Sequence, residues 1–517
     1  MVKKHPRRGI ALVAAGVAAA LALAGCAGVG SSTETGDYSK LVIAQSADTT
    51  TLDPGAVPSI NGERIDRNIY SRLVTLDPET LDPVGDLATD WEQVDDLTWD
   101  FTLRDDVKFS DGSALTGDDV VYSLMRVATD QTLTQYSFFS GIESVTADGD
   151  TIEIKTKAAM PTMLRVLASV GGSILPQQLI ADEGMDAYLQ SPVGSGPYKI
   201  DEWVRDDHIT LSPSSNYFGD TPKWAQVVVR TIPEASTRVS ELLTGGADIV
   251  TDVDPTDWDR LDDDGTAQTV LGPSTRVMLL ALRTNDPWVT ADSRVREAID
   301  LAIDKDLITS TLFKGEATTL RERAVEGVFG ANPDLLNTSV YDQDRAKELV
   351  QEVGGGQPIT IHITAPSDRY LLDTQVAQLI VSELDAVGFD VQLDTLSGTA
   401  YLDAFSNKTN QEGLLIALGD PILDSSSDVP WFQGGNSANV GRLDYENPEV
   451  DALITAAASE MDDTQRQADY EQIWSIISED RPAVFLYQQP DAYGVSDRVN
   501  FTPVLDERIY FDDITVN

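Results

Sequence analysis

The sequence predicts a mixed α/β protein built from more than one domain. Without its first 25 residues, the chain of 517 would keep 492, which is too many for one small core and enough for two or three domains. The apolar fraction of 41% is ordinary for a globular chain, so the high charge does not indicate disorder. Apolar repeats of two and of 3.6 residues both recur along the chain, so strands and helices are both expected.

The amino-terminal segment has the pattern of an export signal. Four basic residues precede a run of apolar residues and glycine over 10–24, which ends in Leu-Ala-Gly-Cys at Cys26. A short apolar core of this kind is typical of a secretory signal, whereas a spanning helix needs about 20 apolar residues. The end of the run resembles a bacterial lipobox. This implies a signal peptide over 1–25 and an acylated Cys26 that holds the protein to the outer face of the cytoplasmic membrane.

The charge of the chain excludes one class of partner. The net charge is −48, and the leader carries four positive charges and no acids, so the mature chain is near −52. Such a field repels nucleic acid, and we expect no nucleic-acid binding. The acidic runs 252–259 and 262–264 lack the ligand spacing of a calcium-binding EF-hand and are expected to be solvated loops. Because Cys26 is the only cysteine, no disulfide is expected.

The first half of the chain alternates strand and helix patterns. Residues 26–39 are mostly small and polar and predict a flexible tether. The apolar run 40–44 predicts a buried strand, and apolar residues at helical spacing over 65–73 predict a helix. Alternation over 99–104 and at 152–154 predicts half-buried strands. Thr116 with the acids that follow it predicts the start of another helix.

The second half changes character at about residue 276. Between 193 and 253 strand patterns dominate, with one helix expected over 236–243. Beyond 276 helices and strands alternate. We expect helices over 295–303, 376–387, 448–460 and 463–479, and strands over 391–393 and 483–486. No internal repeat is present.

Several separated motifs resemble one protein family. In chain order they are TLDP at 51–54, IYSRLV at 69–74, LATDWE at 87–92, TWDFTLRDDVKFSDGSALTGDDVVYSLMR at 98–126, VGSGPY at 193–198 and RVREAIDLAIDKDLI at 294–308. The ordered set resembles the extracytoplasmic solute-binding proteins of peptide-type ABC transporters, the dipeptide, oligopeptide and nickel-binding family 5. Most of these residues are expected to hold the scaffold. In VGSGPY, for example, two glycines would let the backbone pass close to a neighbouring strand.

The resemblance implies a two-lobed, periplasmic-binding-protein-like fold of class II. The first lobe would be discontinuous and would consist of residues 40–57, 192–275 and 488–517, with an extra subdomain inserted over 58–191. Residues 276–487 would form the second lobe. The ligand would sit between the lobes and be buried when the hinge closes.

A zwitterionic peptide in such a cleft needs a partner for each terminal charge, because burying either charge unpaired is costly. In the family, the partner of the amine is an aspartate in a second-lobe loop. The matching stretch here holds Leu418, Gly419 and Asp420. The loop departs from the family pattern, so Asp424 or Asp428 is an alternative partner for the amine.

Further candidates surround this loop. Arg369 and Tyr370 resemble an arginine–tyrosine pair that approaches the cleft in relatives, where the guanidinium fork would take the ligand carboxylate. Ser59, Ile60 and Asn61 lie in the expected loop after the opening strand and would offer backbone contacts, as in strand addition. Tyr401 and Trp431 would line a side-chain pocket or pack in the core.

These observations predict a monomeric, lipid-anchored receptor that captures short peptides and delivers them to ABC permease subunits with cytosolic ATPases. No cofactor or structural metal is expected. A nickel-chelate receptor that uses His362 with carboxylates is the main alternative, and an oligosaccharide receptor, a sensor or a chaperone would share the architecture. A hydrolase is a remote alternative, because the mature chain holds only His208 and His362 and no nucleophile, zinc or phosphate-loop motif.

Overall fold

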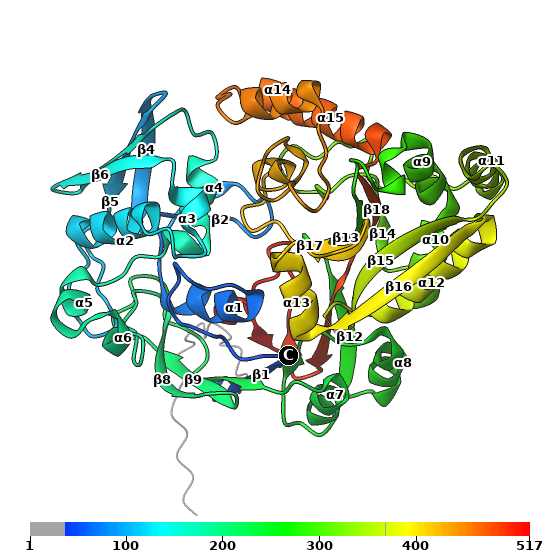
Figure 1. Cartoon of the computed structure of the whole chain (residues 1–517). Helices are drawn as coiled ribbons and strands as arrows, with labels where there is room; N and C mark the ends of the chain where they lie inside the picture. The colour runs from blue at the N-terminus through cyan, green and yellow to red at the C-terminus, as the bar shows by residue number, and fades with distance from the viewer. Residues whose placement is uncertain (1–36, 368) are drawn as a thin grey trace, which may run out of the picture. The chain divides into compact units, whose positions relative to one another are not determined.

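The computed structural model of the chain describes residues 37–367 and 369–517, so the predicted leader, Cys26 and most of the predicted tether lie outside the described residues. The unit Asp37–Asn517 is built around two large mixed sheets and a smaller antiparallel sheet (Figure 1). The predicted α/β class is confirmed. No helix among the described residues is long and apolar enough to cross a membrane.

The first large sheet has seven strands. Its order is β12 (Ala267–Gly272), β19 (Asp491–Ser496), β11 (Ile249–Val250), β1 (Leu41–Gln45), β10 (Val227–Thr231), β9 (His208–Pro213) and β8 (Tyr198–Val204). β1 pairs in parallel with both β10 and β11, and the other pairings are antiparallel. The carboxyl ends of β1, β10 and β11 therefore meet at one edge.

Helices cover both faces of this sheet because side chains alternate along each strand. Ile43 of β1 packs with Ile65 and Ile69 of α1 (Ile60–Ile69). The next residue, Ala44, packs in a separate cluster with side chains of α7 (Ala235–Leu243) and α8 (Pro255–Asp264). The sheet is thus a central layer with apolar contacts on each side.

The second large sheet has six strands. Its order is β14 (Thr318–Thr319), β18 (Ala483–Gln488), β13 (Val277–Leu282), β17 (Gly413–Leu418), β15 (Ile359–Ser367) and β16 (Phe389–Ser397). β15 pairs in parallel with both β16 and β17, so these strands also end at a common edge.

Helices again form a layer on each face of the second sheet. One face packs against α9 (Ser293–Ala302), α10 (Lys305–Leu312), α11 (Gln343–Gly354) and α12 (Asp373–Val387). The other face packs against α13 (Gly398–Ser406), α14 (Pro448–Ala457) and α15 (Asp463–Asp480).

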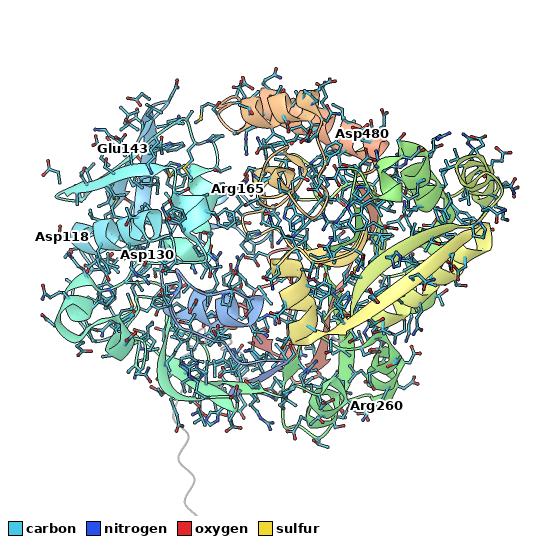
Figure 2. The ribbon with its side chains drawn as sticks, viewed as in Figure 1. Asp118, Asp130, Glu143, Arg165, Arg260 and Asp480 are labelled. Carbon is cyan, nitrogen blue, oxygen red and sulfur yellow. The ribbon has the colours of Figure 1, made fainter. Side chains whose placement is uncertain are left out.

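Residues 74–188 hold the smaller sheet and its helices. The antiparallel sheet has the order β4 (Ala88–Asp95), β5 (Thr98–Leu103), β7 (Thr151–Thr156) and β6 (Ile142–Asp148), and β2 (Val74–Leu76) pairs with β3 (Pro83–Gly85). The helices are α2 (Gly117–Thr129), α3 (Tyr136–Phe139), α4 (Met163–Ala168), α5 (Gln177–Glu183) and α6 (Met185–Tyr188). Exposed acids such as Asp118, Asp130 and Glu143 lie on its outside (Figure 2). A last strand pair joins β20 (Val499–Asn500) to β21 (Thr515–Val516).

Most predicted elements are confirmed. The run 40–44 forms β1, the residues Trp99, Phe101 and Leu103 are buried in β5, and α2 begins where Thr116 was expected to start a helix. The backbone N–H of Thr116 donates to Asp119 Oδ2 at 2.8 Å, which fixes this end of the helix.

Three expectations were wrong. The helix expected over 65–73 ends at Ile69, because the backbone becomes extended at Tyr70. The acidic run that begins at residue 252 is not all loop, because α8 starts at Pro255. The side chain of Asp254 accepts from the N–H of Thr256 at 2.8 Å and caps this helix. Finally, the backbone near Gly194 passes the end of helix α1 and not a strand. A Cβ atom on Gly194 would lie 1.8 Å from the carbonyl oxygen of Ile69.

Candidate functional site

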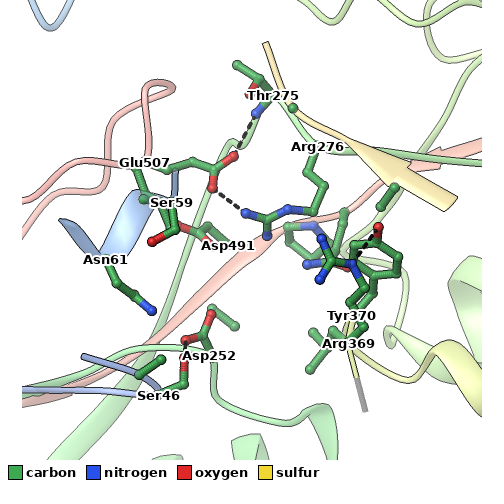
Figure 3. Close-up of a pocket in the computed structure, with 18 of the residues that line it drawn as sticks. Ser46, Ser59, Asn61, Asp252, Thr275, Arg276, Arg369, Tyr370, Asp491 and Glu507 are labelled. Carbon is green, nitrogen blue, oxygen red and sulfur yellow. Dashed lines mark hydrogen bonds and ion pairs between the residues drawn. The ribbon is translucent and has the colours of Figure 1, made fainter. Parts of the chain in front are cut away.

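A cavity of about 910 Å³ lies where loops of the two large sheets face each other. Ser46 follows β1 and Asp252 follows β11 of the first sheet, whereas Arg369 follows β15 and Asp420 follows β17 of the second. All four residues line the cavity. Figure 3 shows Ser46, Asn61 and Asp252 on one side of it and Arg369 and Tyr370 on the other. Carboxyl ends of parallel strands are the usual place for a ligand in α/β sheets.

Asp420 is an anion held in place by its own loop. Its side-chain oxygens accept the N–H groups of Ile422 at 3.0 Å and of Asp424 at 2.9 Å, and its own N–H donates to Thr275 Oγ1 at 2.9 Å. The residue is 5% exposed. Burial raises the pKa of Asp420 to about 6, against the opposing effect of Arg323. The carboxylate is therefore mostly ionised at neutral pH, and it forms no ion pair with any residue that the structure describes.

A buried arginine supports the Asp420 loop from behind. Arg323 Nη2 donates to the carbonyl oxygen of Gly419 at 2.7 Å, and Arg323 Nη1 lies 2.6 Å from Asp428 Oδ1. Asp428 has no exposed surface and does not line the cavity. Asp428 is thus an interior residue and the partner of Arg323.

Arg369 is a cation on the same side of the cavity. Asp373 Oδ2 accepts the N–H groups of Arg369 at 2.9 Å and of Tyr370 at 3.0 Å, which fixes the loop at the start of α12. The guanidinium is exposed, and its Nε donates to the hydroxyl of Tyr370 at 3.1 Å. Within residues 37–367 and 369–517, Arg369 has no carboxylate within ion-pair distance.

The other arginines that line the cavity are already engaged. Arg276 Nη2 lies 2.7 Å from Glu507 Oε2, and Arg508 pairs with Glu63 at 2.6 Å and with Asp506 at 2.9 Å. Arg238 donates to four backbone carbonyl oxygens. Arg369 is therefore the lining guanidinium that is open to an incoming carboxylate.

Ser59, Ile60 and Asn61 line the cavity, but their local structure differs from the expectation. They begin helix α1 instead of forming a loop, so an extended strand cannot pair with them. What they offer is the first turn of a helix, where N–H groups have no acceptor within the helix. The expected strand-addition contact is corrected accordingly.

Four other candidates do not line the cavity. Asp424 has no exposed surface and lies 2.5 Å from Arg466 in an internal ion pair. The hydroxyl of Tyr401 donates to the carbonyl oxygen of Leu415 at 2.9 Å, and Trp431 stacks on Phe405 with ring centroids 5.9 Å apart. Leu418 packs against the core of the second sheet. In the described conformation Asp424 and Tyr401 are interior residues, whereas Trp431 and Leu418 are half-buried and pack against the core of the second sheet.

Some lining residues were not foreseen. They are Ser46, Asp252, Arg276, Asp491 and Glu507. Asp252 was placed in a solvated acidic run, although it follows a strand that runs parallel to β1. The signal available in the sequence was the pair of short apolar runs at 40–44 and 247–253, each followed by polar residues. Parallel pairing of those runs brings Ser46 and Asp252 to one edge.

Comparison with known proteins identifies the family. The family model for bacterial extracellular solute-binding proteins, family 5, matches residues 82–439. The chain belongs to this family. The family comprises solute-binding proteins of ABC importers for peptides or nickel chelates and not enzymes, as the resemblance implied.

Individual relatives agree with this assignment. The chain is 27% identical to the probable D,D-dipeptide-binding periplasmic protein DdpA of Escherichia coli K12. The alignment spans 485 residues and covers 90% of this chain and 92% of the relative. The chain is similar to NikA from Brucella suis in complex with Fe(III)-EDTA, with TM-score 0.83, 23% identity and coverage of 92% and 100%. It is also similar to the periplasmic binding protein DppA from Helicobacter pylori in complex with peptide STSA, with TM-score 0.78, 24% identity and coverage of 92% and 98%. The predicted two-lobed fold is confirmed.

Proposed function

We propose that this protein captures short peptides between its lobes and delivers them to an ABC permease, and that the mature protein is a monomer held to the membrane by lipid at Cys26. The observation that carries the proposal is one pair of lining residues. Asp420 is an ionised carboxylate and Arg369 a guanidinium, and neither has an ion-pair partner among the described residues. A zwitterionic peptide supplies the missing partner of each.

The same cavity supports a proposed division into two lobes and a hinge. We propose that the first lobe is 40–57, 192–275 and 488–517 with the subdomain 58–191 inserted, and that 276–487 is the second lobe. The cavity is lined by Thr275 and Arg276 at one crossing and by Gln489 and Asp491 at the other. Closure about these segments would bring the first turn of α1 toward Asp420, and the ligand would stabilise the closed form by contacting both lobes.

Calorimetry with modified peptides tests the binding mode. We expect trialanine to bind and N-acetyl trialanine to bind at least tenfold more weakly, because acetylation removes the charge that pairs with Asp420. Asp420→Asn should weaken trialanine but leave the acetylated peptide unchanged. Arg369→Gln should abolish the difference between trialanine and its carboxyamide, and Arg345→Gln, on the exposed face of α11, is the matched control. Equal effects on all forms would contradict the assigned roles.

A nickel chelate is the second candidate. The fold is as similar to NikA from Brucella suis, with TM-score 0.83, as to the peptide-bound DppA from Helicobacter pylori, with TM-score 0.78. The charged pair also suits a chelate made from an amino acid. Neither His208 nor His362 lines the cavity, so the predicted use of His362 as a metal ligand is not part of this proposal. Nickel with histidine is therefore run beside the peptides, and a heat signal only for the chelate would overturn peptide capture.

The lipid anchor has its own test. Export of the full chain with Cys26→Ser should move the protein from the membrane fraction to the medium or periplasm, because no lipid can be attached through sulfur. Retention of the variant in the membrane fraction would contradict anchoring at Cys26.

A further inference from the structure

The backbone of Asp420 is fixed by a side chain from the segment where the chain first crosses from one large sheet to the other. The N–H of Asp420 donates to Thr275 Oγ1 at 2.9 Å, and Thr275 lies between β12 of the first sheet and β13 of the second. β13 and β17 pair antiparallel, with Val277 opposite Leu418. Continuing this register by two residues places Thr275 opposite Asp420. The contact therefore follows from the strand pairing, and it fixes the loop where it leaves β17.

The loop passes close to this threonine. Thr275 and Asp420 are both buried. A Cβ atom on Gly419 would lie 3.3 Å from Thr275 Oγ1, so the backbone leaves little room beside the hydroxyl. A buried N–H that loses its acceptor is costly. Removal of the hydroxyl should therefore drive the Asp420 N–H toward another acceptor and move the loop.

Thr275 is itself fixed by the carboxyl-terminal segment of the chain. Its N–H donates to Glu507 Oε1 at 3.2 Å, and Glu507 Oε2 lies 2.7 Å from Arg276 Nη2 (Figure 3). Glu507 is buried and has a φ of 58°, a conformation that residues other than glycine seldom adopt. Such a backbone persists where the surrounding contacts enforce it. One carboxylate thus binds two consecutive residues of the crossing.

The return crossing is joined to the first crossing at the same place. Ser274 Oγ donates to the carbonyl oxygen of Gln489 at 2.6 Å. The N–H of Gln489 donates to the carbonyl oxygen of Arg276 at 2.9 Å. Thr275 lies between these two contacts, so both crossings determine its position.

We propose that Thr275 is a positioning residue for the ligand amine: its hydroxyl, fixed by both crossings, orients the Asp420 loop. This inference rests on the proposed peptide-binding function, in which Asp420 pairs with the amine. Arg323 supports the carbonyl oxygen of Gly419 in the same loop, so loss of the Thr275 hydroxyl loosens the loop and does not free it. Because Thr275 acts through Asp420, its effect is confined to ligands with a free amine.

Calorimetry with hydroxyl variants tests this role. Thr275→Val keeps the shape of the side chain and removes the acceptor. We expect it to bind trialanine about tenfold more weakly and N-acetyl trialanine within about twofold of wild type. Thr275→Ser restores the acceptor and should recover most of the affinity. Thr364→Val is the matched control and should leave both peptides unchanged, because Thr364 is also buried and accepts a backbone N–H, that of Gln411 at 3.3 Å, but does not line the cavity.

A pH series separates positioning from a general loss of structure. The N–H groups of Ile422 and Asp424 donate to the Asp420 carboxylate, and these bonds favour its charged form. Loosening the loop weakens them, so the pKa of Asp420 rises. Binding of trialanine by Thr275→Val should therefore decline at a higher pH than binding by wild type, in which the pKa of Asp420 is about 6. A merely destabilised protein would keep the wild-type pH profile.

A second variant keeps the test valid. Thr275→Ala removes the same hydroxyl without placing a methyl group against the loop, and it serves in place of Thr275→Val if the valine variant does not fold at the temperature of the measurement. Equal weakening of both peptides, wild-type affinity of the folded variants, an unshifted pH profile or no recovery in Thr275→Ser overturns the positioning role alone. If wild type binds the two peptides equally, or binds neither, the proposed function and this inference both fail, and that result appears before any variant is measured.

Discussion

The buried ion pair behind Asp420 gives the most quantitative prediction. Arg323 is 3% exposed and Asp428 is fully buried, with 2.6 Å between Nη1 and Oδ1. Arg323→Ala removes one partner and leaves a buried charge without compensation, which typically costs about 3–5 kcal/mol. The same substitution removes the donor to the carbonyl oxygen of Gly419, so the Asp420 loop loses support.

The cost should depend on pH in a defined direction. Burial raises the pKa of Asp428 well above its usual value even with Arg323 present, and removing the arginine raises this pKa further. A carboxyl group with a higher pKa in the folded state gives a folded state that binds more protons, so stability falls as the pH rises from about 4. The loss is at most about 1.4 kcal/mol per pH unit. Arg323→Ala should therefore be closer to wild type at pH 5 than at pH 8.

Differential scanning calorimetry measures both effects. At pH 7 we expect the melting temperature of Arg323→Ala to fall by roughly 6–20 °C, if the second lobe unfolds as a unit of about 200 residues. Arg345→Ala is the control, because Arg345 is half-exposed and 3.2 Å from Glu348, and surface pairs of this kind contribute about 0–1 kcal/mol. Equal shifts for the two variants, or a shift for Arg323→Ala that does not change between pH 5 and pH 8, would refute the reasoning.

Three further predictions concern the ligand and the scaffold. Arg369→Gln should weaken free-acid peptides about 10–100-fold in calorimetry, because it removes a charge-assisted hydrogen bond to the carboxylate; a change below twofold would argue against this contact. Binding of free-amine peptides should weaken as the pH falls from 7 to 5, since Asp420, with its pKa near 6, takes up a proton and loses its attraction for the amine, whereas N-acetyl peptides should show no such trend. Gly194→Ala should lower the melting temperature at unchanged ligand specificity, because the new Cβ would lie 1.8 Å from the carbonyl oxygen of Ile69; a melting temperature equal to wild type would show that the α1 end moves freely.

Much of the fold was predictable because its signals are local. The alternation of apolar residues at Trp99, Phe101 and Leu103 with polar residues between them predicts a strand with one buried face. Those three residues are buried in β5. The acidic residues from 257 to 264 lie on helix α8, which was expected to be loop; the start of this helix is specified by the capping Asp254 and by Pro255. The negative charge of this segment suggested a solvated loop, but the capping residue and the proline determine that a helix starts here.

The site was predictable only in part, because it is assembled from parallel strands that are far apart in the chain. Asp420 and Arg369 were found through the resemblance to the family, and both line the cavity. Asp424 and Asp428 remained alternatives to Asp420, since nothing local in the sequence shows that Arg466, 42 residues away, pairs with Asp424. Asp252 was missed because its place depends on β11 pairing with β1, a contact over about 200 residues that no local pattern reports.

Native mass spectrometry of the purified protein with a mixture of short peptides tests the central claim most directly. We expect a one-to-one complex in which the released peptide has its original mass, and loss of that complex when Asp420→Asn and Arg369→Gln are combined. A protein that takes up no peptide, or one that releases cleaved fragments, would contradict capture of an unaltered peptide between the lobes.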